Sequence, residues 1–119
     1  MRERDYAEWF SWAKRNVSGS PEMCHVAALA ALQASERGLA KPDAGLEGRR
    51  AAQFRGPAWS RRASERERAY AEWYDWARRQ TRANGETLHR ATEAALGVME
   101  QGGDSRAAAA RAREIMATD

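Results

Sequence analysis

The chain has little of several residue types, and each shortage narrows what the protein can be. Cys24 is the only cysteine among 119 residues, which excludes an internal disulfide bond and any zinc site built from several cysteines. No stretch approaches the roughly 18 consecutive apolar residues of a membrane-spanning helix. The first residues also lack the apolar stretch that is typical of a signal peptide. We therefore expect a soluble, cytoplasmic protein with no membrane partner.

Lysine is also scarce: of the 20 basic residues, 18 are arginine. Arginine binds carboxylates and phosphates through a planar fork and stacks on aromatic rings, so it suits such partners better than lysine does. The same bias is found in proteins encoded by GC-rich genomes, so it is not by itself a sign of function. The formal net charge is only +3, which gives the whole chain little attraction for a polyanion.

Large aromatic side chains are present although charged residues make up 31% of the sequence: there are five Trp, three Tyr and two Phe. These side chains provide large apolar surfaces to bury, so we expect a folded protein. A chain of 119 residues can form one domain of ordinary size. Two independent domains of about 60 residues would each be marginally stable.

The most informative feature is an internal repeat. Residues 2–15, RERDYAEWFSWAKR, return 64 positions later as RERAYAEWYDWARR at 66–79. Without gaps, the match extends from 2–38 onto 66–102 with 18 identities in 37 pairs. Two copies of one unit predict a pseudo-symmetric body in which the halves bury their apolar faces together.

The first segment of each copy has the pattern of an amphipathic helix. The bulky apolar residues of 5–16 share one side of a helix: Tyr6, Trp9, Phe10 and Trp12. The corresponding helix of the second copy begins near residue 65, where Ser64 and Glu67 have the spacing of a capping box. We therefore predict that both copies open with an aromatic helix.

A second helix is predicted in each copy, over about 21–37 and 85–101. Ser20 and Asn84 stand at the N-cap positions of these helices. A glycine follows each helix and supplies its C-terminal stop. Many alanines in both segments leave a surface that an aromatic helix can approach closely.

The copies diverge after their second helices. Asp104 can cap a third helix over about 105–117. In the first copy, Pro42 and the neighbouring glycines permit at best a shorter helix around 44–53.

The predicted fold is all-α. A helical hairpin with two main helices plus a shorter third per copy is duplicated in tandem and packed as one compact pseudo-two-fold helical bundle. The predicted boundaries are 1–53 for the first repeat, 54–63 for an arginine-rich connection and 64–119 for the second repeat.

His25 and His89 are the only histidines, and they occupy equivalent positions in the two copies. A shared metal is one interpretation, but neither histidine has a His, Cys, Asp or Glu at a recognisable ligand spacing. Inheritance through the duplication explains the pairing, so we expect structural or surface histidines that hold a helix end or a Trp edge. Cys24 aligns with Leu88 and is expected to be a packing residue. We predict no metal site and no cofactor.

Trp12 and Trp76 are the first candidate binding residues. They lie at the edge of the aromatic side of their helices, about 60° from Trp9 and Trp73. Each is therefore either a core residue or a partly open anchor for a partner. The sequence has no Gly-rich phosphate loop or nucleophile elbow, so we do not expect an enzyme.

The connection between the copies is the second candidate site. Residues 49–68 contain seven arginines and only two acidic residues, Glu65 and Glu67. The partner-binding candidates here are Arg55, Trp59, Arg61 and Arg62. The same stretch also contains Phe54, Arg49 and Arg50. Arginines interleaved with aromatic residues can hold phosphates and stack bases. The opposing interpretation is a solvated linker whose aromatic residues pack onto the body and whose arginines pair with nearby acids.

The repeat period of 64 residues and the WxxW spacing do not match the common 34-residue helical repeats. We therefore expect a small adaptor that binds a protein partner and has no catalytic activity, and self-association stays open. Two alternatives remain. One is an accessory nucleic-acid-binding protein that uses the arginine-rich connection, and the other is a small-ligand pocket lined by paired tryptophans.

Overall fold

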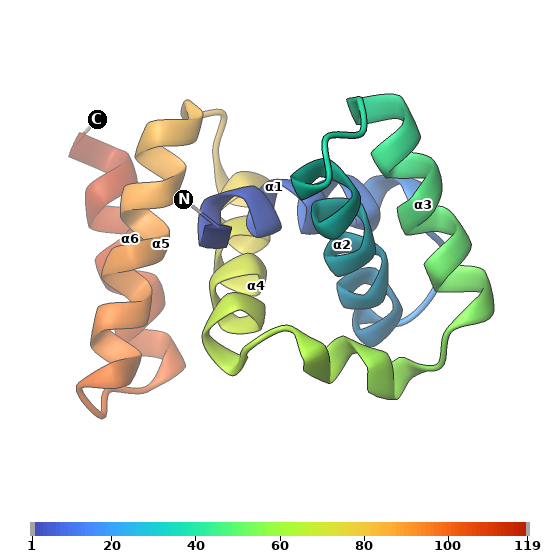
Figure 1. Ribbon diagram of the computed structural model, residues 1–119. Helices are drawn as coiled ribbons and strands as arrows, with labels where there is room; N and C mark the ends of the chain where they lie inside the picture. The colour runs from blue at the N-terminus through green and yellow to red at the C-terminus, as the bar shows by residue number, and fades with distance from the viewer. Residues whose placement is uncertain (1, 119) are drawn as a thin grey trace. The chain divides into compact units, whose positions relative to one another are not determined.

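The structure, a computed structural model, describes residues 2–118, and Figure 1 shows that this range is helical. The elements in chain order are α1 (Arg2–Asn16), α2 (Pro21–Glu36), α3 (Lys41–Phe54), the 3-10 helix η1 (Pro57–Arg62), α4 (Glu65–Gln80), α5 (Gly85–Glu100) and α6 (Ser105–Thr118). No strand occurs within the described range. The prediction of an all-α fold is confirmed.

Packing divides the chain after Ala71 into two compact units. The first unit contains α1, α2, α3, η1 and the beginning of α4, and the second contains the remainder of α4 with α5 and α6. This division falls inside α4 and is defined by packing contacts. The predicted boundaries were defined by the sequence repeat, so the two divisions describe different properties. Those boundaries stay a prediction.

Side-chain caps explain where three of the helices begin. The Ser20 hydroxyl accepts a hydrogen bond from the Met23 amide, which starts α2, and Asn84 plays the same part for α5. Asp104 Oδ1 accepts from the amide of Ala107 at 2.8 Å and starts α6. Each cap satisfies an amide that the first turn of a helix leaves without an intrahelical partner. All three caps were predicted from the sequence.

The beginning of α4 and the ends of α2 and α5 also follow the predicted signals. Ser64 and Glu67 form a reciprocal capping box, with both hydrogen bonds at 3.0 Å. Gly38 after α2 has φ +96° and Gly102 after α5 has φ +92°. Only glycine adopts this conformation without steric cost, so these two residues terminate the helices.

The third helix of the first copy is longer than predicted. α3 has 14 residues, as α6 does, so the prediction of a shorter helix around 44–53 is wrong. Pro42 lies in the first turn, where its missing amide hydrogen costs nothing. Gly48 lies against α2, where a Cβ would come within 2.8 Å of the Ala27 carbonyl oxygen. The glycine therefore permits close packing and does not break the helix.

The core of the first unit is built around α2, which packs against α1, α3 and η1. Every residue from Cys24 to Leu32 is buried, and a helix that is buried on all sides is typical of the centre of a core. Six of these nine residues are alanine, valine or cysteine, so the neighbouring helices can lie close to its axis. The aromatic side of α1 supplies the bulk, with Tyr6 and Phe10 both buried.

In the second unit, helix α5 packs against α6, and one buried cluster consists of four alanines: Ala91, Ala95, Ala108 and Ala112. Trp73 and Trp76 cover this alanine cluster from α4. Across residues 2–118, no helix combines the length and the apolar character needed to cross a membrane.

Candidate interaction surfaces

The first candidate surface is a hollow between α1 and α3, which we call the Trp12 hollow. Its volume is about 390 Å³, and its lining residues are Trp9, Trp12, Lys41, Pro42, Gly45, Leu46 and Arg49. The two tryptophans come from α1 and all the other lining residues come from α3. The hollow therefore depends on α3 beginning as early as Lys41.

The missing side chain at Gly45 positions Trp12. A Cβ on Gly45 would lie 3.1 Å from the Trp12 ring, so the indole rests directly on the α3 backbone. Trp9 meets Trp12 edge to face, with ring centroids 5.4 Å apart and planes 84° apart. Trp9 is buried, whereas Trp12 is only partly buried. One part of the Trp12 ring is thus held in place and another part faces solvent.

Two cationic side chains stand at the rim of the Trp12 hollow. The guanidinium carbon of Arg49 lies 5.8 Å from the Trp12 ring centroid, within the range of a cation–π contact. Lys41 lines the hollow from the first turn of α3. None of the lining residues is acidic. The hollow therefore combines an aromatic and aliphatic wall with positive charge.

A second hollow of about 520 Å³ shares Trp9, Trp12 and Lys41 with the first. Its other lining residues are Asp5, Glu8, Arg15, Leu32, Ser35 and Glu36. Three of these six residues are acidic, so the second hollow has mixed charge. The tryptophan pair thus contributes to two hollows of different electrostatic character in the first unit.

Trp76 has a related setting in the second unit. It meets Trp73 edge to face, with centroids 5.4 Å apart and planes 85° apart, and Arg113 lies 5.3 Å from its ring centroid. Trp76 is partly buried, as Trp12 is. Both predicted edge tryptophans therefore combine a packed side with an open side.

The arginine-rich connection combines features of both interpretations. Trp59 packs back onto the body, against Val26, Ala30 and Ala51. Phe54 does not, because 82% of its surface is exposed. The hypothesis of a linker whose aromatic residues both tuck in is therefore correct for only one of them.

Two arginines of the connection lie over the Trp59 ring. The guanidinium carbons of Arg55 and Arg62 lie 4.0 Å and 5.5 Å from its ring centroid. Arg61 is exposed on η1. Within residues 2–118, none of these three arginines forms an ion pair with an acidic side chain. The expected pairing with nearby acids does not occur for them.

The two histidines are buried within separate aromatic cores. His25 Nδ1 lies 2.7 Å from the Tyr6 hydroxyl, and its ring stacks on Phe10 with centroids 4.3 Å apart. His89 stacks on Tyr74 at 4.4 Å. Both histidines therefore pack against aromatic rings. No group of three or more His, Cys, Asp or Glu residues is arranged for metal binding within the described range.

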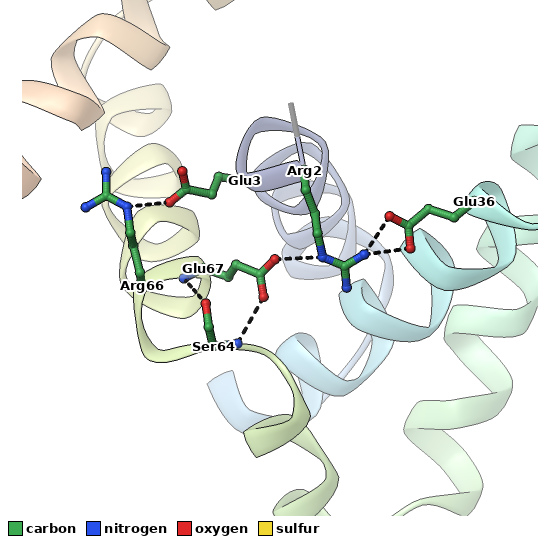
Figure 2. Close-up of polar contacts among 6 residues, drawn as sticks. All are labelled: Arg2, Glu3, Glu36, Ser64, Arg66 and Glu67. Carbon is green, nitrogen blue, oxygen red and sulfur yellow. Dashed lines mark hydrogen bonds and ion pairs between the residues drawn. The ribbon is translucent and has the colours of Figure 1, made fainter.

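Sequence reasoning missed a charged network at the start of α1, which Figure 2 shows. Arg2 Nη1 donates to Glu36 Oε1 at 2.6 Å, and Arg2 Nε donates to Glu67 Oε2 at 2.8 Å. Arg66 pairs with Glu3 at 2.7 Å. Since Glu67 also completes the capping box of α4, the network ties that cap to α1 and α2. The RER triplet in both copies was the available signal, but its partners are distant in sequence.

The network changes the proton affinity of Arg2. The hydrogen bond to Glu36 raises the pKa of Arg2 above its ordinary value, partial burial opposes this, and the hydrogen bond to Glu67 adds to it. Arg2 is therefore charged throughout the pH range of ordinary solution work.

Lys41, Pro42 and Leu46 were also missed as site residues. Lys41 and Pro42 line the Trp12 hollow because α3 begins earlier than its proline and glycines indicate, and Leu46 lines it through tertiary packing. Comparison of the chain with protein-family models gave no match, and neither did comparison with curated proteins or with solved structures. The function therefore has to be inferred from the geometry.

Proposed function

We propose that the protein is a small helical adaptor that binds a protein partner through the Trp12 hollow and has no catalytic activity. The observation that carries this proposal is a half-open tryptophan beside an apolar hollow with two cations at its rim. Aromatic anchors in partly enclosed pockets contribute most of the energy of many protein interfaces. The partner segment places one apolar side chain against Trp12.

The charge of the hollow defines the partner further. Lys41 and Arg49 stand beside Trp12, and no acidic residue lines the hollow. Carboxylates that flank the apolar side chain of the partner would complement these two cations. Leu46, of which 48% is exposed, supplies the aliphatic wall that the partner would cover. The proposed partner is therefore an acidic segment of another protein.

A comparison of two variants tests the adaptor proposal. Leu46→Glu places a carboxylate in the hollow, and Ala110→Glu makes the same kind of change at the exposed equivalent position of α6, 64 residues later. In nuclease-treated lysate, the wild type and Ala110→Glu should capture the same protein, and Leu46→Glu should lose it. Retention of that protein by Leu46→Glu, or capture of nothing except a second copy of this chain, would overturn the proposal.

The small-ligand alternative is separable from the adaptor proposal. A volume of about 390 Å³ lies at the lower end of the range for ligand pockets. A ligand in the hollow would change the fluorescence of Trp9 and Trp12. The adaptor proposal predicts unchanged fluorescence across a panel of metabolites and a change when the captured protein is added.

We also infer that the two copies arose by tandem duplication of a three-helix unit. The bounds of α2 and α5, and those of α3 and α6, each differ by 64 positions, the period of the sequence repeat. The angle between the paired tryptophan planes is 84° in one copy and 85° in the other. These matches support a common origin.

Packing of the copies as one pseudo-two-fold body is a separate part of this inference, and it predicts one cooperative unfolding transition. Leu29→Ala and Leu96→Ala should then lower the midpoint of that same transition, although the two leucines belong to different units. Two transitions, each affected by one variant, would contradict it.

A further inference from the structure

A second surface lies at the end of α3 and along η1, and we call it the η1 surface. Its residues are Phe54, Arg55, Trp59, Arg61 and Arg62. Trp59 forms its base, because this side chain packs on Val26, Ala30 and Ala51. Arg55 and Arg62, which lie over the Trp59 ring, are therefore anchored to the core of the first unit and do not belong to a free linker. None of them lines the Trp12 hollow.

The η1 surface concentrates positive charge. Arg55 and Arg62 both lie over the Trp59 ring, with guanidinium carbons 4.0 Å and 5.5 Å from its centroid. From Gly48 to Ser64 the sequence has five arginines and no acidic residue. Arg55, Arg61 and Arg62 also have no carboxylate partner in the part of the chain that the structure describes. Cations held together without a counter-charge favour binding of an anion, and guanidinium groups match phosphate oxygens in geometry.

Phe54, next to Arg55 in the sequence, adds an exposed apolar ring. It is 82% exposed, against 48% for Leu46 and 37% for Met99, the other exposed large apolar residues. It directly precedes Arg55 in sequence and is the last residue of α3. An aromatic ring can stack with any nucleobase, whichever base it is, and guanidinium groups can bind the phosphates of the same strand.

We propose that the η1 surface binds single-stranded nucleic acid. Arg55, Arg61 and Arg62 contact the phosphates, and a base stacks on Phe54. A single strand is favoured over a duplex because the bases of a duplex are already stacked on each other and do not expose a face to Phe54. Binding here is independent of the Trp12 hollow, so the protein could hold a protein and a nucleic acid at once.

Fluorescence anisotropy with a labelled oligothymidylate and the full-length protein tests this proposal. Phe54→Ala should weaken binding by about 5- to 150-fold, which is the usual contribution of one stacked base, and Phe54→Tyr should retain it. The triple variant Arg55→Gln, Arg61→Gln, Arg62→Gln should lower the slope of log affinity against log salt by about 2, because single strands contribute about 0.7 per phosphate.

A control variant of equal charge distinguishes binding at the η1 surface from general electrostatic attraction to the whole protein. The triple variant Arg37→Gln, Arg82→Gln, Arg106→Gln removes the same charge from exposed positions elsewhere and should bind nearly as the wild type does. Helical circular dichroism of each variant confirms that it is folded.

Four results would overturn the proposal. These are no binding by the wild type at about 50 mM salt, equal losses in the two triple variants, tighter binding of a duplex than of the single strand, and equally effective competition by polyglutamate.

Discussion

The guanidinium carbon of Arg49 lies 5.8 Å from the ring centroid of Trp12, and Arg113 lies 5.3 Å from that of Trp76. Arg113 follows Arg49 by 64 positions, and Trp76 follows Trp12 by the same number. The continuous sequence match ends near residue 38, so this contact extends the correspondence into the third helices. The surroundings differ, because Pro42 and Leu46 in α3 correspond to arginine and alanine in α6.

Two helical glycines are expected to respond in opposite ways to substitution by alanine, because only Gly48 lies at the close contact between α3 and α2. Gly48→Ala would place a Cβ 2.8 Å from the Ala27 carbonyl oxygen and 3.2 Å from the Ala31 Cβ. We expect it to destabilise the protein by about 1 to 3 kcal/mol through overpacking. Gly97→Ala in α5 meets nothing within 4 Å and should stabilise by about 0.5 to 1 kcal/mol. Urea denaturation of both variants checks the signs, and stabilisation by Gly48→Ala would contradict the packing described for α3.

The buried contact between Tyr6 and His25 predicts a coupling energy. Tyr6→Phe removes the hydroxyl that lies 2.7 Å from His25 Nδ1 and leaves a buried ring nitrogen without that partner. The expected loss is about 1 to 3 kcal/mol in the free energy of unfolding. His25→Phe in the Tyr6→Phe background should cost less than His25→Phe alone, because both polar partners are then absent. Additive effects in this double-mutant cycle would show that the two side chains are not coupled.

The network around Arg2 predicts a dependence on salt, and none on the titration of Arg2 itself near neutral pH. The pKa of Arg2 is raised, so the part of the stability that depends on its own charge is fully present below the ordinary arginine pKa and is lost as the pH rises through the raised value. Its side chain is 43% exposed, and solvent screening therefore limits the loss in Arg2→Ala to about 1 kcal/mol or less. Thermal unfolding at low salt and at about 1 M salt should show the difference shrink. A loss that stays constant across this range would contradict the electrostatic origin.

Local signals in the sequence were enough to predict part of the fold. Ser20, Asn84 and Asp104 each act on an amide three residues away, so their caps need no knowledge of the remaining chain. The aromatic side of α1 was predictable because its spacing repeats every turn. The length of α3 was not predictable in this way. Gly48 weakens a helix locally, and only its contact with α2 shows why a glycine stands there.

The candidate sites were predictable to a smaller extent. Trp12 was identified from its place at the edge of the aromatic side, but its α3 neighbours depend on tertiary packing. In the connection, Phe54 and Trp59 are equivalent by sequence, since both are aromatic residues near proline and glycine. The structure separates them, because Trp59 packs on Val26 and Ala30 whereas Phe54 remains exposed.

Photo-crosslinking from the Trp12 hollow tests the central claim most directly. A photoreactive amino acid is placed at position 46 in one variant and at position 110 in another, and the crosslinked peptides from cells are identified by mass spectrometry. The account predicts that position 46 crosslinks to one peptide of another protein with carboxylates around an apolar residue, and that position 110 does not. Equal crosslinking from both positions, or crosslinks from position 46 only to copies of this chain, would contradict it.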